Sequence, residues 1–286
     1  MTKAVRQMQE DLKLIDLVIE LIDARIPYSA RNPQMDQLAQ GKGRLLLLNK
    51  SDLADPQQNA LWIDYYQNTR NCFACAIDAR NKKSIAKASA LIDQAAAKKK
   101  QKDLSRGIKN RPVRAMVVGI PNAGKSTFIN TFAGKSAAKT GNRPGVTRGK
   151  QWIRLNKSVE LLDTPGILWP KFDDQTIGLH LAAVGSIRDE VLSIEELACD
   201  TISEIRRLYP GRIADFYSVD EDGKPFEILD SIALCRKCLK VKGETDAKRA
   251  AGIFLDDFRT GRLGKLTLDR IEDFSPKNAT SSKQGE

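Results

Sequence analysis

One eight-residue run constrains this chain most: Gly119-Ile-Pro-Asn-Ala-Gly-Lys-Ser126. It matches the pattern G-x-x-x-x-G-K-[ST], in which glycines let successive backbone N–H groups face bound phosphates. The required context is present, because the apolar run Ala115 to Val118 precedes it and a helical pattern, Thr127 to Phe132, follows it. We therefore expect residues 119–126, the phosphate loop, to join a strand to a helix in an α/β protein.

Several side chains near this loop have the chemistry of nucleotide hydrolysis. Lys125 is expected to reach the β- and γ-phosphates, and the Ser126 hydroxyl to ligate Mg²⁺. A second motif, Asp163-Thr-Pro-Gly166, ends another strand-like run. In P-loop enzymes such an aspartate holds Mg²⁺, and the glycine amide meets the γ-phosphate. Thr147 lies between the two motifs, where its hydroxyl is placed to sense Mg²⁺ and the γ-phosphate.

A third motif, Asn49-Lys50-Ser51-Asp52 (the base loop), addresses the choice of base. It directly follows four leucines at 45–48, which we expect to form a buried strand. The Asp52 carboxylate can accept from guanine N1–H and the exocyclic amine together, whereas adenine offers no such donor pair. Asn49 can donate to the carbonyl edge of the base, and the Lys50 stem can cover its ring. The motif therefore predicts a guanine nucleotide.

The order of the motifs is unusual. The base loop precedes the phosphate loop, the reverse of the order in common small GTPases. A sheet tolerates such a permutation because strand neighbours, not chain order, form the site. The new connection is residues 98–114, which hold eight basic residues and one acid. Their glycine and proline predict an exposed linker rather than a packed helix.

The pattern changes after Trp169-Pro170, where amphipathic helical stretches follow without intervening strands. The stretches are 177–187, 193–209, 226–241 and 244–264. We expect an α/β P-loop GTPase domain over 1–172 and a smaller α-helical domain over 173–275. The polar tail, 276–286, is expected to be disordered.

Charge and cysteine content add expectations about partners. The chain has 47 Lys and Arg against 36 Asp and Glu, a formal charge of +11. This excess indicates a polyanionic partner such as nucleic acid; a merely basic protein is the alternative. No run approaches the roughly 20 apolar residues of a membrane span, and no signal peptide is evident, so we expect a cytoplasmic protein. The pairs Cys72/Cys75 and Cys235/Cys238 are far apart, and free thiols are expected rather than zinc.

Together these motifs resemble those of the bacterial circularly permuted ribosome-biogenesis GTPases that act in large-subunit assembly. The matching runs are DARIP with SARNP at 23–33, LLNKSD, GIPNAGKSTFIN, KTGNRPGVTRGKQW and LLDTPGILWPKF, in that order over about the first 172 residues. The helical region resembles the family's RNA-binding domain more loosely. The resemblance implies GTP hydrolysis coupled to late maturation of the large (50S) subunit, with Mg²⁺ as cofactor. It also implies rRNA, bound in a nucleotide-dependent way, and ribosomal proteins as partners; we expect a monomer.

The resemblance assigns roles residue by residue. GTP binding falls to Asn49, Lys50, Ser51, Asp52, Asp78, Ala79, Asn122, Ala123, Gly124, Lys125, Ser126, Thr127 and Gly166. The Mg²⁺ ligands are Ser126, Thr147 and Asp163, and the catalytic residues are Lys125 and Thr147. Asn122 is expected to bind K⁺, because potassium-activated GTPases with this motif have Asn at that position. The alternative is that Asn122 only shapes the turn of the loop.

Two features depart from the family and class patterns. The family's proposed catalytic histidine lies in a short segment before the stretch that matches Met1 to Ala4, and it is missing here. The one histidine, His180, is expected to be structural. Ile167 stands where a glutamine usually follows the DxxG motif, and an apolar side chain cannot orient the attacking water. We therefore expect slow intrinsic hydrolysis. Two alternatives to a ribosome-assembly GTPase stay open from the sequence. One is a nucleotide-gated RNA-binding module with little hydrolysis, and the other is a P-loop kinase or ATPase.

Overall fold

The computed structural model describes residues 3–70, 72–108, 111–134, 151–154, 158–163, 174–187, 193–241 and 243–274. Its strands are β1 (Leu17–Asp23), β2 (Gly43–Asn49), β3 (Phe73–Ala76), β4 (Val113–Val118), β5 (Gln151–Arg154) and β6 (Val159–Asp163). Its helices are α1 (Lys3–Lys13), α2 (Met35–Leu38), α3 (Pro56–Arg70), α4 (Lys82–Ala95), α5 (Ala97–Ser105), α6 (Lys125–Ala133), α7 (Gln175–Ala183), α8 (Ile194–Leu208), α9 (Arg212–Tyr217), α10 (Pro225–Cys235), α11 (Ala247–Arg259) and α12 (Ile271–Phe274).

The strands form one sheet in the order β3-β2-β1-β4-β6-β5. All neighbouring pairs are parallel except β5 with β6, which is antiparallel. Strand β4, which leads into the phosphate loop, lies between β1 and β6 although it follows β3 in the chain. The carboxyl ends of the parallel strands meet at one edge of the sheet, and this edge brings the permuted motifs together.

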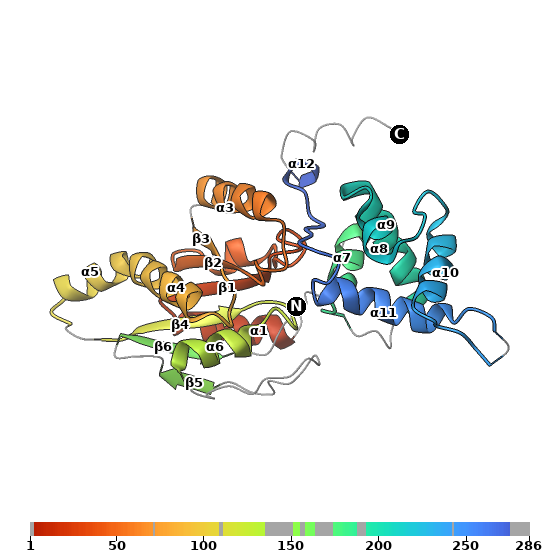
Figure 1. Cartoon of the computed structure of the whole chain (residues 1–286). Coiled ribbons are helices and arrows are strands. Elements are labelled where there is room, and N and C mark those ends of the chain that lie inside the picture. The colour runs from red at the N-terminus through yellow and green to blue at the C-terminus, as the bar shows by residue number, and fades with distance from the viewer. Residues whose placement is uncertain are drawn as a thin grey trace, which may run out of the picture.

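Both faces of the sheet are covered, as expected for parallel strands rich in Leu, Ile and Val. On β1, Leu17, Ile19 and Leu21 pack in the cluster that includes α4 and α6. The alternate residue Val18 packs with α1 and α2, and Ile22 packs in the cluster that includes α3. The sheet is therefore the middle layer between two layers of helices (Figure 1).

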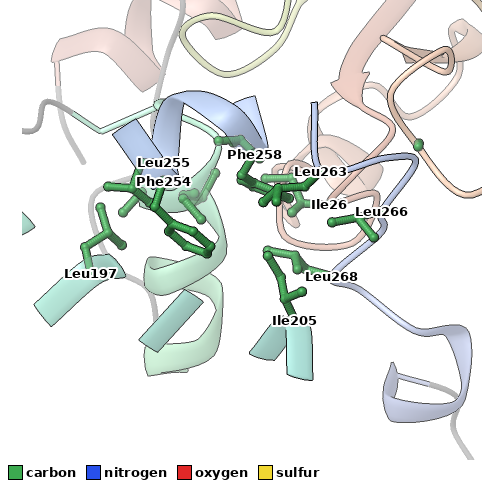
Figure 2. Close-up of a cluster of buried hydrophobic side chains, with 14 of the residues drawn as sticks. Ile26, Leu197, Ile205, Phe254, Leu255, Phe258, Leu263, Leu266 and Leu268 are labelled. Carbon is green, nitrogen blue, oxygen red and sulfur yellow. The ribbon is translucent and has the colours of Figure 1, made fainter. Parts of the chain in front are cut away.

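Helices α7 to α11 gather beside the sheet-containing part (Figure 1). Residues 261–270, the return segment, then run back from α11 to the sheet-containing part. The Leu268 N–H donates to Arg25 O over 2.8 Å, and the Leu266 N–H donates to Leu53 O over 3.1 Å. Ile26 lies beside Leu263 and Leu266 in the same buried cluster as Phe254 of α11 (Figure 2). One continuous core therefore joins the two parts of the chain.

Residues 98–114 were predicted to be an exposed linker rather than a packed helix, and the structure shows that most of their first half belongs to a largely exposed helix, α5. Lys99 forms an ion pair with Asp103 one turn later, and Lys100 pairs with Asp93 of α4 at 2.7 Å. The i,i+4 pair of Lys99 with Asp103 and the helix-forming Lys and Gln side chains stabilise this helix even though it stays largely exposed. A glycine with φ 76, Gly107, follows the helix.

The helix over 226–241 and the domain boundary near residue 172 are two further predictions from the sequence. The helix expected over 226–241 ends at Cys235, because the chain turns at Lys237, whose φ is 53. The predicted domain boundary near residue 172 lies outside the described residues. Within the described residues, no helix is both long and apolar enough to cross a bilayer.

Candidate nucleotide-binding site

Asn49, at the carboxyl end of β2, connects three loops at the edge of the sheet. Its side chain is buried, and its Nδ2 donates to Ala123 O in the phosphate loop over 2.7 Å. Its Oδ1 accepts from the Ala79 N–H, after β3, over 2.9 Å. The structure therefore brings together three residues that were predicted from separate parts of the sequence.

The phosphate loop depends on glycine at Gly124, whose φ is 95. A Cβ at this position would lie 2.3 Å from Asn49 Nδ2, so only glycine lets the two loops approach. Lys125 begins α6 and is buried, and its Nζ donates to Gly119 O and Ile120 O over 3.0 and 2.9 Å. Backbone N–H groups at a helix start, beside a lysine ammonium, are an arrangement that binds phosphate.

Asp52 presents a carboxylate with one free acceptor. Its Oδ2 accepts from Arg80 Nη2 over 2.6 Å. Its Oδ1 is buried and is one of four side-chain polar atoms in the described part of the chain that are buried without a hydrogen-bond partner. Such an acceptor carries a desolvation cost unless a donor meets it. A donor pair such as that of guanine, which the sequence predicted for Asp52, is the kind of group this carboxylate could accept from.

Arg80 was not predicted from the sequence. Its Nε donates to Asp78 Oδ1 over 3.0 Å, while its Nη2 holds Asp52. Partial burial alone would raise the pKa of Asp78, but the hydrogen bonds and charge of Arg80 hold it below its usual value. Arg80 thus fixes two predicted base-side carboxylates at once. Its position two residues after Asp78 was the available signal.

Asp23 and Arg25 are also residues for which the sequence predicted no role, although they belong to the DARIP run. Asp23 is buried at the end of β1, opposite Asn49 in register. Its Oδ2 lies 2.9 Å from Lys50 Nζ and 2.8 Å from Arg25 Nη2. Burial alone would raise the pKa of Asp23, but the charges and hydrogen bonds of Arg25 and Lys50 hold it well below its usual value. The lysine of the base loop is therefore held by a buried carboxylate.

The predicted metal ligands are placed only in part. Ser126 and Thr127 lie in the first turn of α6, and the backbone of Asp163 ends β6, opposite Val117 of the neighbouring β4. A hydroxyl and a carboxylate from adjacent elements are the oxygen donors that suit Mg²⁺. Thr147, Gly166 and Ile167, like the Asp163 side chain, lie outside the described residues.

His180 lies away from these loops, in the buried contact between α7 and the return segment. Its Nδ1 is 2.7 Å from Asp269 Oδ1 and 3.4 Å from Ser29 Oγ. Asp269 also accepts from the Ser29 N–H over 2.7 Å. These buried contacts give His180 a structural position.

A mostly parallel sheet with a phosphate loop after its central strand β4 and an Asn-Lys-x-Asp loop after β2 defines a P-loop GTPase with permuted motifs. Residues 114–208 match the family model described as 50S ribosome-binding GTPase. Ribosome biogenesis GTPase A of Bacillus cereus is 43% identical over 275 residues, which cover 96% of this chain and 93% of that protein. The chain therefore belongs to the ribosome biogenesis GTPase A family.

Two further comparisons agree with this membership. Ribosome biogenesis GTPase A of Priestia megaterium is 44% identical over 271 residues, which cover 94% of each chain. The crystal structure of GNP-bound YlqF from T. maritima matches with a TM-score of 0.67 and 26% identity, covering 95% of this chain and 99% of that chain. The chain is thus a GTP-binding GTPase, and the kinase and ATPase alternatives are set aside.

Proposed function

We propose that this GTPase acts in late maturation of the large (50S) ribosomal subunit, binding rRNA and ribosomal proteins most tightly with GTP bound. The observation that supports it is a direct contact between the nucleotide site and the helical part: Asn122 Nδ2 of the phosphate loop donates to Gly185 O, after α7, over 2.6 Å. Through this contact a change at the phosphates reaches the part of the chain that would bind RNA. The names of the relatives and of the matching family model point to the same partner.

In this proposal residues 1–172 form the GTPase domain and residues 173–275 bind the ribosome. The helical part offers basic side chains for RNA, since Lys237 and Lys240 are exposed around the turn after α10. In the GTPase domain, Asn49 and Asp52 read guanine, and Lys125 stabilises charge that develops on the phosphates. Ser126, Thr147 and Asp163 hold Mg²⁺, which offsets phosphate charge when bound.

Binding to the large subunit is expected to weaken steeply with salt and to strengthen with a non-hydrolysable GTP analogue. Phosphate contacts release counterions, so the logarithm of the affinity should fall linearly with the logarithm of the salt concentration. The measurement is co-sedimentation with purified 50S subunits across a salt series, with the analogue, GDP or no nucleotide. Isolated 30S subunits are the control. Salt-independent binding, or equal affinity with GDP, would contradict the proposal.

Potassium is expected to stimulate GTP hydrolysis more than sodium, with Asn122 as a ligand. Because Asn122 Nδ2 is engaged with Gly185 O, its Oδ1 is the atom available to a cation. A monovalent cation there would offset charge that develops during phosphoryl transfer, as an arginine finger does in other GTPases. Turnover is compared in the two salts at equal ionic strength, and Asn122→Ala should lose the difference.

The matched control for this prediction is Ser186→Ala. Ser186 Oγ donates to Pro121 O over 2.9 Å, so this variant also loosens the contact between the phosphate loop and the segment after α7. It leaves the carboxamide of Asn122 in place, and potassium stimulation should persist. Equal wild-type rates in potassium and sodium would rule out the cation role.

A further inference from the structure

We propose that the C-terminal end of α11, at Phe258 and Arg259, couples the base loop and the phosphate loop to the helical part, with Asp23 and Arg25 as the positioning residues on the guanine side. Two separate chains of contacts reach this end of α11, one from each loop. The inference rests on the proposed function only in assigning RNA binding to the helical part. It adds the regulation of the nucleotide site by that part.

The first chain of contacts begins at Lys50 in the base loop. Lys50 Nζ contacts Asp23, and both oxygens of Asp23 are held by Arg25, whose Nε donates to Oδ1 over 2.9 Å. The Nη1 of Arg25 then donates to Arg259 O and Phe258 O over 3.0 and 3.4 Å. Phe258 and Arg259 are the last two residues of α11, and their carbonyl oxygens have no hydrogen-bond partner within the helix. The positive charge of a guanidinium also suits this end of a helix. Arg25 is itself only 1% exposed, so solvent does not screen the contact.

The second chain of contacts begins at Asn122 in the phosphate loop. Asn122 donates to Gly185 O, and the neighbouring Ser186 donates back to Pro121 O. Arg259 of α11 holds the same segment, because its Nε donates to Ala183 O and its Nη2 to Ala182 O, each over 2.9 Å. The phosphate loop therefore also reaches the last residue of α11, through a path that shares no residue with the first except Arg259.

Both series of contacts start at a residue whose backbone φ is positive. Among the described residues, four that are not glycine have positive φ, and two of these are Lys50 (φ 60) and Asn122 (φ 61). Such a conformation costs on the order of 1–3 kcal/mol and persists only when its surroundings hold it. A bound nucleotide that contacts both loops would fix these two residues and, with them, the contacts that follow.

Helix α11 is suited to carry the effect further. It packs against α8 and α10, and Phe254 and Leu255 on its inner face are buried in the core of the helical part (Figure 2). Because the side chains of α11 are closely packed against α8 and α10, a displacement of its C-terminal end moves the helix as a whole. By reciprocity, a partner that binds the helical part would change the affinity for guanine nucleotide by the same factor.

The test is hydrogen exchange at the end of α11 in the full chain, with and without saturating GDP. In the wild type, GDP should slow exchange of the amides at 260–263 by at least about fivefold, the low end of typical couplings between sites. Arg25→Gln removes the charge that joins Asp23 to α11 but leaves the second path intact, so GDP should slow exchange at 260–263 clearly less in this variant than in the wild type. Arg25→Lys keeps a charge but not the forked geometry, and should restore part of the protection.

The matched control is Arg70→Gln, an arginine on α3 that pairs with Asp36 on the surface and should behave as the wild type. If Arg25→Gln does not fold, Arg259→Gln interrupts the second chain and should also reduce the protection. Wild-type protein that binds GDP without protection at 260–263, or equal protection in Arg25→Gln or Arg259→Gln and the wild type, would overturn the inference. This exchange assay contains no ribosomal subunits. A failure to bind subunits in the co-sedimentation experiment would therefore refute the proposed function and leave this inference standing.

Discussion

Asp52→Asn is expected to weaken GTP and GDP binding by more than tenfold and to raise the affinity for xanthine nucleotides. The buried Oδ1 of Asp52 has no partner in the described part of the chain, and the proposed role of this carboxylate is to accept from the two donors of guanine. An amide places a donor where an acceptor is needed, and losing one partner of a buried charged hydrogen bond costs roughly 2–5 kcal/mol. Xanthine offers the complementary edge. Titration with fluorescent GDP and XDP measures both changes.

Asp64→Asn is the control for this variant, since Asp64 is an exposed aspartate on α3 whose carboxylate accepts from Asn68 one turn later in the same helix. It should leave both affinities unchanged. Thermal unfolding of each variant without nucleotide separates lost base recognition from lost folding. Unchanged GTP affinity in Asp52→Asn would refute the assignment of guanine recognition to Asp52.

Gly124→Ala is expected to lower GTP affinity on the order of a hundredfold, because backbone strain of about 1–3 kcal/mol adds to a steric clash. The added Cβ would lie 2.3 Å from Asn49 Nδ2, at a φ of 95 that L side chains rarely adopt. Asn49 must then leave Ala123 O, and with it the contact between the base loop and the phosphate loop. Isothermal titration with GDP measures the loss.

Gly134→Ala is the control that separates the steric clash with Asn49 from the backbone strain of a side chain at positive φ. Gly134 ends α6 with φ 66, and a Cβ there would meet nothing within 4 Å. It should therefore lower stability by about 1–2 kcal/mol and leave nucleotide affinity nearly unchanged. Equal losses of GDP affinity in the two variants would show that close approach to Asn49 does not set the requirement at residue 124.

The sequence predicted the parts of the site whose signals are local. A strand, a glycine-rich turn and a helix in succession place Lys125 and Ser126, and a leucine run ending in Asn49 places the base loop. The position of β4 beside β1 is known only from the structure, because the strand order of a permuted sheet cannot be read from chain order.

The residues that escaped prediction act across long separations. Arg80 fixes Asp52 from another loop, and Arg25 reaches carbonyls more than 230 positions away. No periodicity or motif spacing records such contacts, because they depend on how two packed parts meet. Helix α5 escaped for the opposite reason, since charge density and a nearby glycine and proline concealed a helix stabilised by pairs such as Lys99 with Asp103.

Because the return segment lies near the C-terminal end of the sequence, the contacts it makes with the GTPase part can form only late in synthesis. Leu53, directly after the base loop, is made early, yet its carbonyl receives the N–H of Leu266. Ser29 likewise meets Asp269, which follows it by 240 positions. A growing chain can therefore contain every nucleotide motif while the base loop still lacks its supporting partners. The contacts that support the base loop are complete only after residue 269 has been made, so the folding unit is longer than the segment that carries the motifs.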